Sequence, residues 1–444
     1  MSEQMNQAAT LDAETINELR TAYAQQPNAQ VLERAVTKNG IKAASWDNHA
    51  ATRLNRAFSV EVDTGAVSNQ KHSGRCWLFA TLNTLRHSMA TQYKIKDFEL
   101  SQSYLFFWDR VERANSFYTK MIEYASRPID DRDIQFLLSM AGTDGGQWNM
   151  AAGLVQKYGV VPSYVMPEVH NTEDSSEIEW ALNAKERKDA VTLRSLVNDG
   201  ATAAEVESAR KQMLTEVYRM AAYSFGEPPV NFDFEYKDDD KTYHIDRGLT
   251  PKAFLDKYFT ADFNDYVVVS NSPDKAYNQL YAMPAQDNIA SGNPIQFLNE
   301  PMDVLKNVAI AQLKDGETVW FGNDVLQQMD RKTGYLDTDL FQTDQLFDVD
   351  SKMSKADRLL TGQGEVTHAM TLTGVDLVDE TPRRWKVENS WGKDNGADGY
   401  FVMTDQWMMD YVYEVVVNKK YLTDVQRAVL ETEPTILPSW DPLK

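Results

Sequence analysis

The stretch Gln70-Lys71-His72-Ser73-Gly74-Arg75-Cys76-Trp77-Leu78-Phe79-Ala80 contains the only cysteine of this 444-residue chain. One thiol cannot form an internal disulfide or a cysteine-based metal site, so Cys76 is either an inert buried side chain or a nucleophile. For an isolated cysteine the inert alternative is the more common, because free cysteine behaves as a small hydrophobe. The neighbouring sequence favours the nucleophile.

The residues that follow Cys76 predict a helix over residues 76–93. Large apolar side chains recur there at steps of four, three and four, as on one buried helical face: Leu78, Leu82, Leu85 and Met89. Gly74 suits the turn that enters this helix, which places Cys76 in its first turn. A thiol reacts as the thiolate, and both a helix N-terminus and a nearby imidazolium lower its pKa. We therefore expect a lowered pKa at Cys76.

A base for this thiol has to come from one of six histidines. His87 lies about three turns into the predicted helix and cannot reach the thiol. His368 lies in the middle of a predicted strand with apolar alternation, where a neutral, hydrogen-bonded core histidine is the ordinary alternative. Asn389 would orient His368 if their two strands are neighbours. Gln70 offers a side-chain N–H which, with the backbone N–H of Cys76, can stabilise an oxyanion.

The wider pattern is helical in the first half and rich in strands in the last third, which predicts an α+β fold. Asp12 caps a first amphipathic helix, a charged helical stretch covers residues 171–226, and Thr250-Pro251 opens another helix. Alternating apolar residues predict a hairpin over residues 232–245 and later strands over residues 318–321, 366–372, 385–389, 399–403 and 413–417.

Composition narrows the possible partners and location. The chain has 45 basic and 66 acidic residues, and a net charge of −21 opposes a general affinity for nucleic acid or anionic lipid. No run of 18 apolar residues exists, so we expect no membrane span. The polar first ten residues lack a secretory pattern, and a single unpaired cysteine suits a reducing, cytoplasmic setting.

Four blocks of the sequence resemble those of papain-like cysteine peptidases. They are Gln70…Ser73-Gly74-Arg75-Cys76-Trp77, Asp144-Gly145-Gly146-Gln147-Trp148, Thr367-His368-Ala369 and Asn389-Ser390-Trp391-Gly392. The order Gln, Cys, His, Asn is also that of the family. The stretch between Cys76 and His368 is about twice the ~130–150 residues of ordinary papains.

That long spacing and Arg75 in place of a smaller residue resemble the bleomycin hydrolase and bacterial aminopeptidase C branch. The similarity runs from near residue 30 to the end. It is greatest to aminopeptidase C of lactic acid bacteria, in residues 319–337 and 164–167.

The resemblance implies a papain-like fold of two lobes, one helical and one barrel-like and sheet-rich, with a large insertion. We predict five regions. They are an N-terminal helical arm (1–60), the helical lobe with the nucleophile (61–170), a charged helical and hairpin insertion for oligomerisation (171–300), the sheet-rich lobe with His368 and Asn389 (301–430) and a C-terminal arm in the cleft (431–444).

By the same resemblance, Cys76, His368, Asn389 and Gln70 are the catalytic residues. The backbone of Gly145 and Gly146 would line the substrate cleft, although a tight turn is an alternative for this glycine pair. No metal and no cofactor is implied.

Members of the branch are homohexamers whose C-terminal carboxylate holds the free α-amine of the substrate. Here that carboxylate belongs to Lys444, which departs from the small residue expected at this end. The enzyme could remove Lys444 itself, or the shifted carboxylate could alter specificity. Trp440 and two prolines could hold the tail in place, and a disordered tail is the alternative.

The sequence therefore predicts a cytoplasmic cysteine aminopeptidase that acts through a thioester acyl-enzyme on peptides with a free N-terminus. If the arm fails to block the cleft, an oligopeptide endopeptidase is the alternative. A non-enzymatic binding or scaffold protein on the same fold would have lost Cys76, His368 or Asn389, and none is lost.

Overall fold

The computed structural model describes residues 10–95, 97–290 and 292–443. Contacts divide the chain into two units, Met1–Ala51 with Asp339–Lys352 and Thr52–Thr338 with Met353–Lys444. The helices are α2 (Ala13–Gln25), α3 (Ala29–Asn39), α4 (Ile41–Ala44), α5 (Ala50–Arg53), α6 (Cys76–Tyr93), α7 (Gln102–Glu123), α8 (Arg132–Met140), α9 (Trp148–Tyr158), α10 (His170–Glu173), α11 (Ser176–Asn198), α12 (Ala203–Phe225), α13 (Pro251–Tyr258), α14 (Met302–Lys314), α15 (Thr343–Phe347), α16 (Lys355–Thr361), α17 (Asp405–Tyr411) and α18 (Asp424–Val429). The strands are β1 (Val60–Glu61), β2 (Phe232–Lys237), β3 (Tyr243–Leu249), β4 (Tyr266–Ser270), β5 (Gln279–Ala282), β6 (Gln296–Asn299), β7 (Val319–Asn323), β8 (Met329–Asp330), β9 (Tyr335–Leu336), β10 (His368–Val378), β11 (Thr381–Glu388), β12 (Tyr400–Thr404), β13 (Val412–Asn418) and β14 (Thr435–Ile436).

The smaller unit is helical. Its helix α2 begins after Asp12, whose carboxylate accepts a hydrogen bond from the N–H of Thr15 at 2.8 Å, so the predicted cap is confirmed. The apolar side chains Ile16, Leu19 and Tyr23 are between 39% and 58% exposed. The apolar face predicted for this helix is therefore present but is not covered within the described chain.

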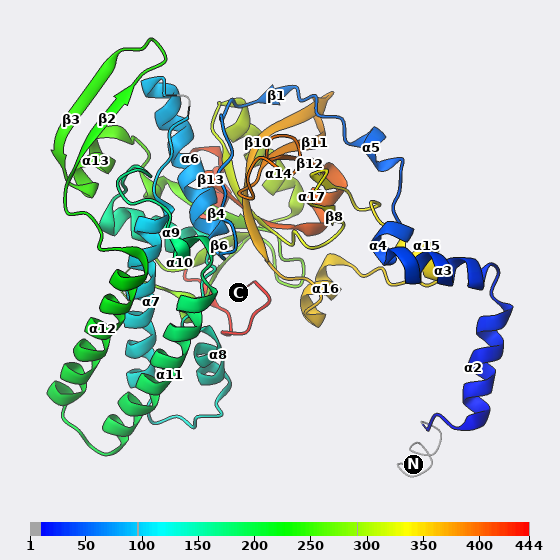
Figure 1. The fold of residues 1–444 in the computed structure, drawn as a ribbon, viewed down its shortest axis with the longest axis horizontal. Coiled ribbons are helices and arrows are strands. Elements are labelled where there is room, and N and C mark those ends of the chain that lie inside the picture. Colours follow the sequence, from blue (N-terminus) through cyan, green and yellow to red (C-terminus); the bar gives the residue numbers. More distant parts are fainter. Residues whose placement is uncertain (1–9, 96, 291, 444) are drawn as a thin grey trace. The chain divides into compact units, whose positions relative to one another are not determined.

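Helix α6 lies at the centre of the larger unit (Figure 1). It packs against α7 and α9 on one side and against β10 and β7 on the other. The predicted apolar face is confirmed, because Leu78, Leu82, Leu85 and Met89 are all buried. The long helices α11 and α12 pack against α7 and against each other, which extends the helical half away from the sheet (Figure 1).

One mixed sheet forms the other half, in the strand order β14-β5-β6-β4-β13-β7-β10-β11-β12-β9-β8, with β1 on β10. The central strands β13, β7, β10, β11 and β12 are antiparallel neighbours. On one sheet face Trp320 and Val416 join the core of the helical half, and on the other Phe321 and Val415 join a second core that includes residues of α14 and α17. The predicted α+β class is confirmed.

Two strand predictions need correction. His368 is the first residue of β10, not a residue in its middle, and Asn389 lies directly after β11. The ladder from β10 to β7 stops at the pair His368 and Asn323 because β7 itself ends at Asn323. Both side chains therefore stand where strands end and a cleft begins.

Other local predictions are confirmed. The strands β2 and β3 form the predicted antiparallel hairpin, with Tyr236 opposite His244. Helix α13 begins at Pro251, and the hydroxyl of Thr250 accepts a hydrogen bond from the N–H of Ala253 at 3.1 Å. None of the helices in the described ranges has both the length and the apolar character that crossing a membrane requires.

Candidate active site

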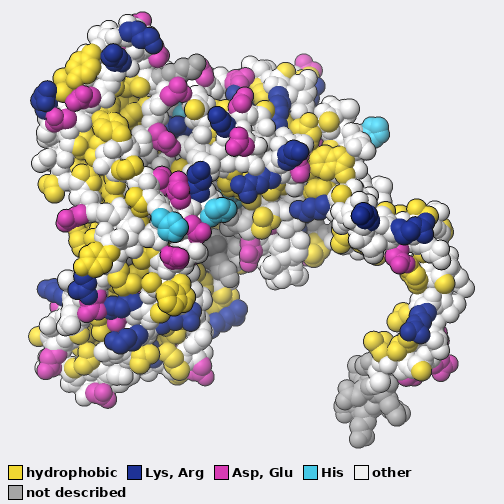
Figure 2. Space-filling model, in the orientation of Figure 1, with side chains coloured by type: hydrophobic (Ala, Val, Ile, Leu, Met, Phe, Trp, Pro, Cys, Tyr) yellow, Lys and Arg dark blue, Asp and Glu magenta, His cyan; other side chains and the backbone are white. Residues whose placement is uncertain are grey.

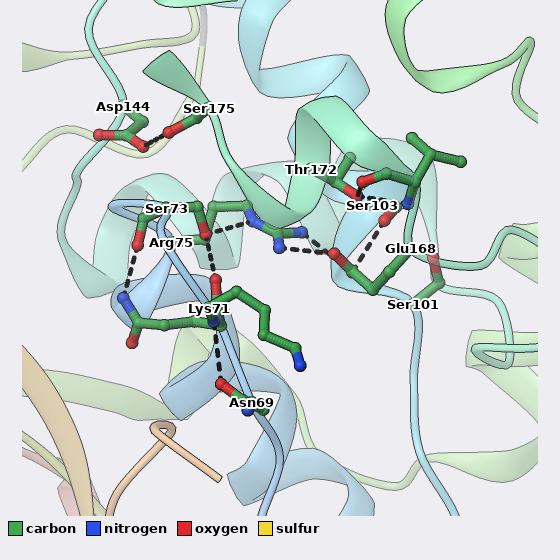
Figure 3. A network of polar contacts seen from close by, with 12 residues as sticks. Asn69, Lys71, Ser73, Arg75, Ser101, Ser103, Asp144, Glu168, Thr172 and Ser175 are labelled. Atoms are coloured by element: carbon green, nitrogen blue, oxygen red, sulfur yellow. Dashed lines mark hydrogen bonds and ion pairs between the residues drawn. The ribbon is translucent and has the colours of Figure 1, made fainter.

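Cys76 is the first residue of α6, and the loop before it is held by an ion pair between the fully buried Arg75 and the half-buried Glu168. The guanidinium of Arg75 donates to both carboxylate oxygens of Glu168, at 3.0 Å to Oε1 and 2.6 Å to Oε2 (Figure 3). Its Nε–H also donates to Oγ of Ser73 at 2.9 Å, and Glu168 accepts from Ser103 at 2.8 Å. Because the Arg75 side chain is fully buried, this fork fixes the residue that precedes the thiol.

His368 and Asn389 meet at the ends of β10 and β11. Nε2 of His368 lies 2.9 Å from Oδ1 of Asn389, and both side chains are buried. The backbone N–H of Ser390 donates to the same Oδ1 at 2.7 Å. A backbone N–H can only donate, so this bond identifies the oxygen of the Asn389 amide, and His368 must then carry its proton on Nε2. Nδ1 of His368 is left as the basic nitrogen.

The thiol lies beside this histidine. The backbone N–H of Ala369, the residue after His368, is near enough to the sulfur of Cys76 to lower the pKa of the thiol. Cys76, His368 and Gln70 line one cleft of about 420 Å³ between the helical half and the sheet. The structure therefore brings these three candidate residues together in one cleft.

Gln70 stands on the cleft wall with its amide oriented by two hydrogen bonds. Its Nε2 donates to the carbonyl of Ser73 at 2.6 Å, and its Oε1 accepts from the hydroxyl of Ser390 at 2.6 Å. A primary amide has two N–H groups, so one N–H of Gln70 is available to a ligand.

The glycine pair lines the same cleft. Gly145 has a φ of +71°, and its N–H donates to the carbonyl of Gly74 at 3.0 Å. A Cβ on Gly146 would lie 2.8 Å from the ring of Trp77. A side chain at either position would therefore strain the backbone or collide with the residue after Cys76.

The pKa values of Cys76 and His368 differ from what the sequence predicts. Burial raises the pKa of the Cys76 thiol to about 11, and the N–H groups of Ala369 and Trp77 offset only part of this increase. Burial also lowers the pKa of His368 to about 4, against the opposing effect of its hydrogen bond to Asn389. The lowered thiol pKa expected from the helix N-terminus is therefore wrong for the free protein. Moving the proton from Cys76 to His368 leaves the net charge unchanged, so the two groups can ionise as a pair at lower cost than singly.

The pKa of His368 predicts how the reactivity of Cys76 depends on pH. Below pH of about 4 the imidazole is already protonated and cannot take the thiol proton, so alkylation of Cys76 by iodoacetamide should slow as the pH falls through that value. We expect this in rates measured together with circular dichroism, which monitors unfolding. His368→Ala should lose the midpoint near pH 4, and its slower alkylation should instead keep rising with pH as the thiol of Cys76 itself ionises. A midpoint at the ordinary imidazole value of 6.5 would contradict the effect of burial.

Sequence reasoning missed two neighbours of the site. The ring of Trp391 lies 4.8 Å, centroid to centroid, from the imidazole of His368 and covers it. Its position two residues after Asn389 was the available signal. Gln147 was missed as well. Its Nε2 donates to the carbonyl of Leu443 at 3.1 Å, which brings the end of the chain to a residue of the cleft wall.

The C-terminal arm is tied down along its length. β14 pairs with β5, and the N–H of Leu437 donates to the carbonyl of Ala282 at 2.9 Å. The guanidinium of Arg132 lies 3.8 Å from the centre of the Trp440 ring. Leu443 is buried, while Lys444 lies outside the described residues.

Comparisons with known proteins cover nearly the whole chain. A family model described as the peptidase C1-like family matches residues 10–444. Aminopeptidase G of Lactobacillus delbrueckii subsp. lactis is 55% identical over 98% of this chain and 99% of its own. Aminopeptidase E of Lactobacillus helveticus is 54% identical over 98% of this chain and 100% of its own. The crystal structure of PepW from Lactobacillus rhamnosis HN001 superposes with a TM-score of 0.97, at 48% identity, over 98% of this chain and 99% of that one.

Proposed function

The chain belongs to the peptidase C1-like family, and we propose that it is a cysteine aminopeptidase whose nucleophile is Cys76. The observation that carries the proposal is the hydrogen bond between Nε2 of His368 and Oδ1 of Asn389, with Cys76 and His368 lining the same cleft. The names of the full-length relatives support an aminopeptidase over the endopeptidase alternative.

In the proposed mechanism the thiol of Cys76 gives its proton to Nδ1 of His368 as the sulfur attacks the peptide carbonyl. Asn389 holds the imidazole in the tautomer that leaves Nδ1 basic and stabilises the imidazolium that forms. The proton then passes to the leaving amine, and a thioester remains on Cys76. Water gives a proton to His368 as it attacks this thioester. The C–S bond then breaks, the acid leaves, and the sulfur of Cys76 takes the proton back from His368.

The charge that develops on the carbonyl oxygen needs hydrogen-bond donors. The backbone N–H of Cys76 has no acceptor within α6 because it belongs to the first residue of the helix. The second N–H of Gln70 is the other donor in this proposal. Their combined effect is worth several kcal/mol in comparable sites, where loss of one donor costs about 10²–10³ in rate.

We propose that the C-terminal arm limits the cleft to substrates with a free N-terminus. The support is the hydrogen bond from Gln147 of the cleft wall to the carbonyl of Leu443, the residue that precedes Lys444 in the sequence. The carboxylate of Lys444 would then bind the α-ammonium group of the substrate. Gly145 and Gly146 would approach the backbone of the bound peptide.

Matched peptides with and without an N-acetyl group test this function. Free peptides should be cleaved with a kcat/KM at least a hundredfold above that of the acetylated peptides, because acetylation removes the charge that the carboxylate would bind. Removal of residues 440–444 should raise cleavage of the acetylated peptides and lower that of the free ones. Comparable rates on both substrate sets in the full chain would favour the endopeptidase alternative.

We further propose a cytoplasmic homohexamer. Large exposed apolar side chains on α11 and α12 support an assembly, with Trp180 76% and Tyr223 83% exposed. Figure 2 shows apolar surface over this helical half, among charged side chains. Sedimentation equilibrium of the full chain tests the stoichiometry. The single unpaired cysteine supports the reducing compartment.

A further inference from the structure

Glu414 is a carboxyl side chain on a sheet face that otherwise packs into the core of the helical half. It lies in β13 opposite Gly322 of β7, two residues from Val416, which faces Trp320. Both Trp320 and Val416 are core residues of that half. Because side chains two residues apart in a strand share a face, Glu414 points the same way.

The side chain of Glu414 has room because its neighbour across the ladder is a glycine. A Cβ on Gly322 would lie 2.4 Å from Oε1 of Glu414. On the other side of Gly322 the register partner is Ala369, which directly follows His368 and lines the cleft with Cys76. Glu414 and Ala369 are thus two strands apart at the same level of the sheet, and both line the cleft.

Among the described residues that line the cleft, the other carboxyl groups have partners. Asp144 accepts from the N–H of Gly74, Glu186 accepts from the N–H of Gly142 at 2.9 Å, and Asp287 accepts from the N–H of Ile295 at 2.9 Å. No described residue donates a hydrogen bond to Glu414 or forms an ion pair with it. Burial raises its pKa to about 7, with no neighbouring charge to oppose the effect.

The cations of the cleft cannot serve as partners either, because they are bound elsewhere. The guanidinium of Arg113 donates to Asp109 at 2.8 Å and to the carbonyl of Gly145. The ammonium of Lys120 donates to the carbonyls of Ala285 at 2.9 Å and Asp287 at 3.2 Å. Glu414 is half-buried, so its carboxylate is only partly hydrated and has no partner, and a cation supplied by a ligand would offset the cost of that partial burial.

We propose that Glu414 binds an ammonium or guanidinium group in the cleft and so selects substrates with a basic side chain near the scissile bond. The proposal rests on the proposed peptidase function and specifies its substrate class. The same chemistry has a second possible source, the side-chain ammonium of Lys444, which follows Leu443 in the sequence; the carbonyl of Leu443 accepts a hydrogen bond from Gln147 of the cleft wall. A tail ammonium would compete with the substrate for Glu414.

The test compares substrates in which lysine or norleucine occupies each of the first two positions, since norleucine keeps the aliphatic chain and lacks the ammonium. We measure the ratio of kcat/KM for the lysine substrate to kcat/KM for the norleucine substrate. This ratio is compared among the wild-type chain, Glu414→Gln and the control Glu365→Gln. Glu365 is exposed, so its substitution removes the same charge outside the cleft. Each variant is also made without Lys444.

We expect Glu414→Gln to lower the ratio at least tenfold, while Glu365→Gln leaves it in place. If Glu414→Gln lowers the ratio already in the chain that retains Lys444, the substrate is the source of the cation. If Glu414→Gln lowers the ratio only in the chain without Lys444, the ammonium of Lys444 is what binds Glu414 in the full chain. An unchanged ratio in both backgrounds overturns the proposal.

Binding to Cys76→Ala protein separates this inference from the proposed function. Calorimetry with lysine and norleucine peptides needs no turnover, so a preference for lysine that Glu414→Gln removes would support the cation site even if no peptide were hydrolysed. Equal binding of both peptides, with and without Lys444, would count against Glu414 whatever the catalytic result. Melting curves of Glu414→Gln check that the fold is retained.

Discussion

Cys76→Ala should reduce turnover of free-amine peptides by about 10⁴-fold or more and leave the melting temperature almost unchanged. The loss is large because the acyl-enzyme cannot form without the sulfur, and the remaining donors give only residual catalysis. The fold should survive because the core of α6 is made by its leucines and not by the thiol. Steady-state kinetics and differential scanning calorimetry on the same preparation measure both effects.

A control on the same helix is available. Ser88→Ala removes one small polar group from an exposed position of α6 and should keep wild-type kcat/KM. The turnover rate of His368→Ala should be nearly as low as that of Cys76→Ala. The rate of the double variant should be little lower still, because the two residues act as one unit. Turnover by Cys76→Ala at more than a hundredth of the wild-type rate would rule out the thiol as nucleophile.

Features set by local periodicity could be predicted from the sequence. The apolar face of α6, the cap at Asp12, the β2–β3 hairpin and the start of α13 at Pro251 each depend on residues within a few positions of one another. The strand ends could not be predicted in this way. β10 begins at His368 because its partner β7 ends at Asn323, and alternation within β10 contains no information about β7.

The candidate site shows the same limit. The order of Gln70, Cys76, His368 and Asn389 was enough to propose that they meet. In the structure Gln70, Cys76 and His368 line one cleft, and Asn389 is hydrogen-bonded to His368. The pKa of Cys76 was mispredicted because a helix N-terminus is visible in the sequence, whereas burial depends on packing by distant segments. Glu414 gave no local signal for the same reason, since Gly322 and Ala369 reach it only through strand pairing.

Arg75 shows how a departure from ordinary papains gains a physical explanation in the structure. A large cation next to the nucleophile is costly to bury unless it is paired, and its partner Glu168 comes from the loop before α10. The hydroxyl of Ser73 accepts a hydrogen bond from Arg75, and the hydroxyl of Ser103 donates one to Glu168 (Figure 3). The pair therefore links the loop that precedes Cys76 to a separate segment of the helical half.

Glu168→Gln should lower the free energy of unfolding by about 3 kcal/mol, because it leaves the charge of Arg75 buried and uncompensated. It should also lower kcat, since Arg75 directly precedes the thiol. Urea titration and steady-state kinetics measure the two effects. Asp424→Asn is the matched control, because it breaks the exposed pair of Asp424 with Arg427 and should cost less than about 1 kcal/mol.

A double variant shows whether charge or shape is responsible. Arg75→Met combined with Glu168→Leu removes both charges and keeps apolar volume, so it should recover much of the stability lost by Glu168→Gln. Recovery of stability without recovery of kcat would mean that the hydrogen bond from Arg75 to Ser73 positions the loop for catalysis. If Glu168→Gln were no more destabilising than Asp424→Asn, the pair of Arg75 with Glu168 could not be what holds Cys76 in place. The packing of α6 alone would then have to account for its position.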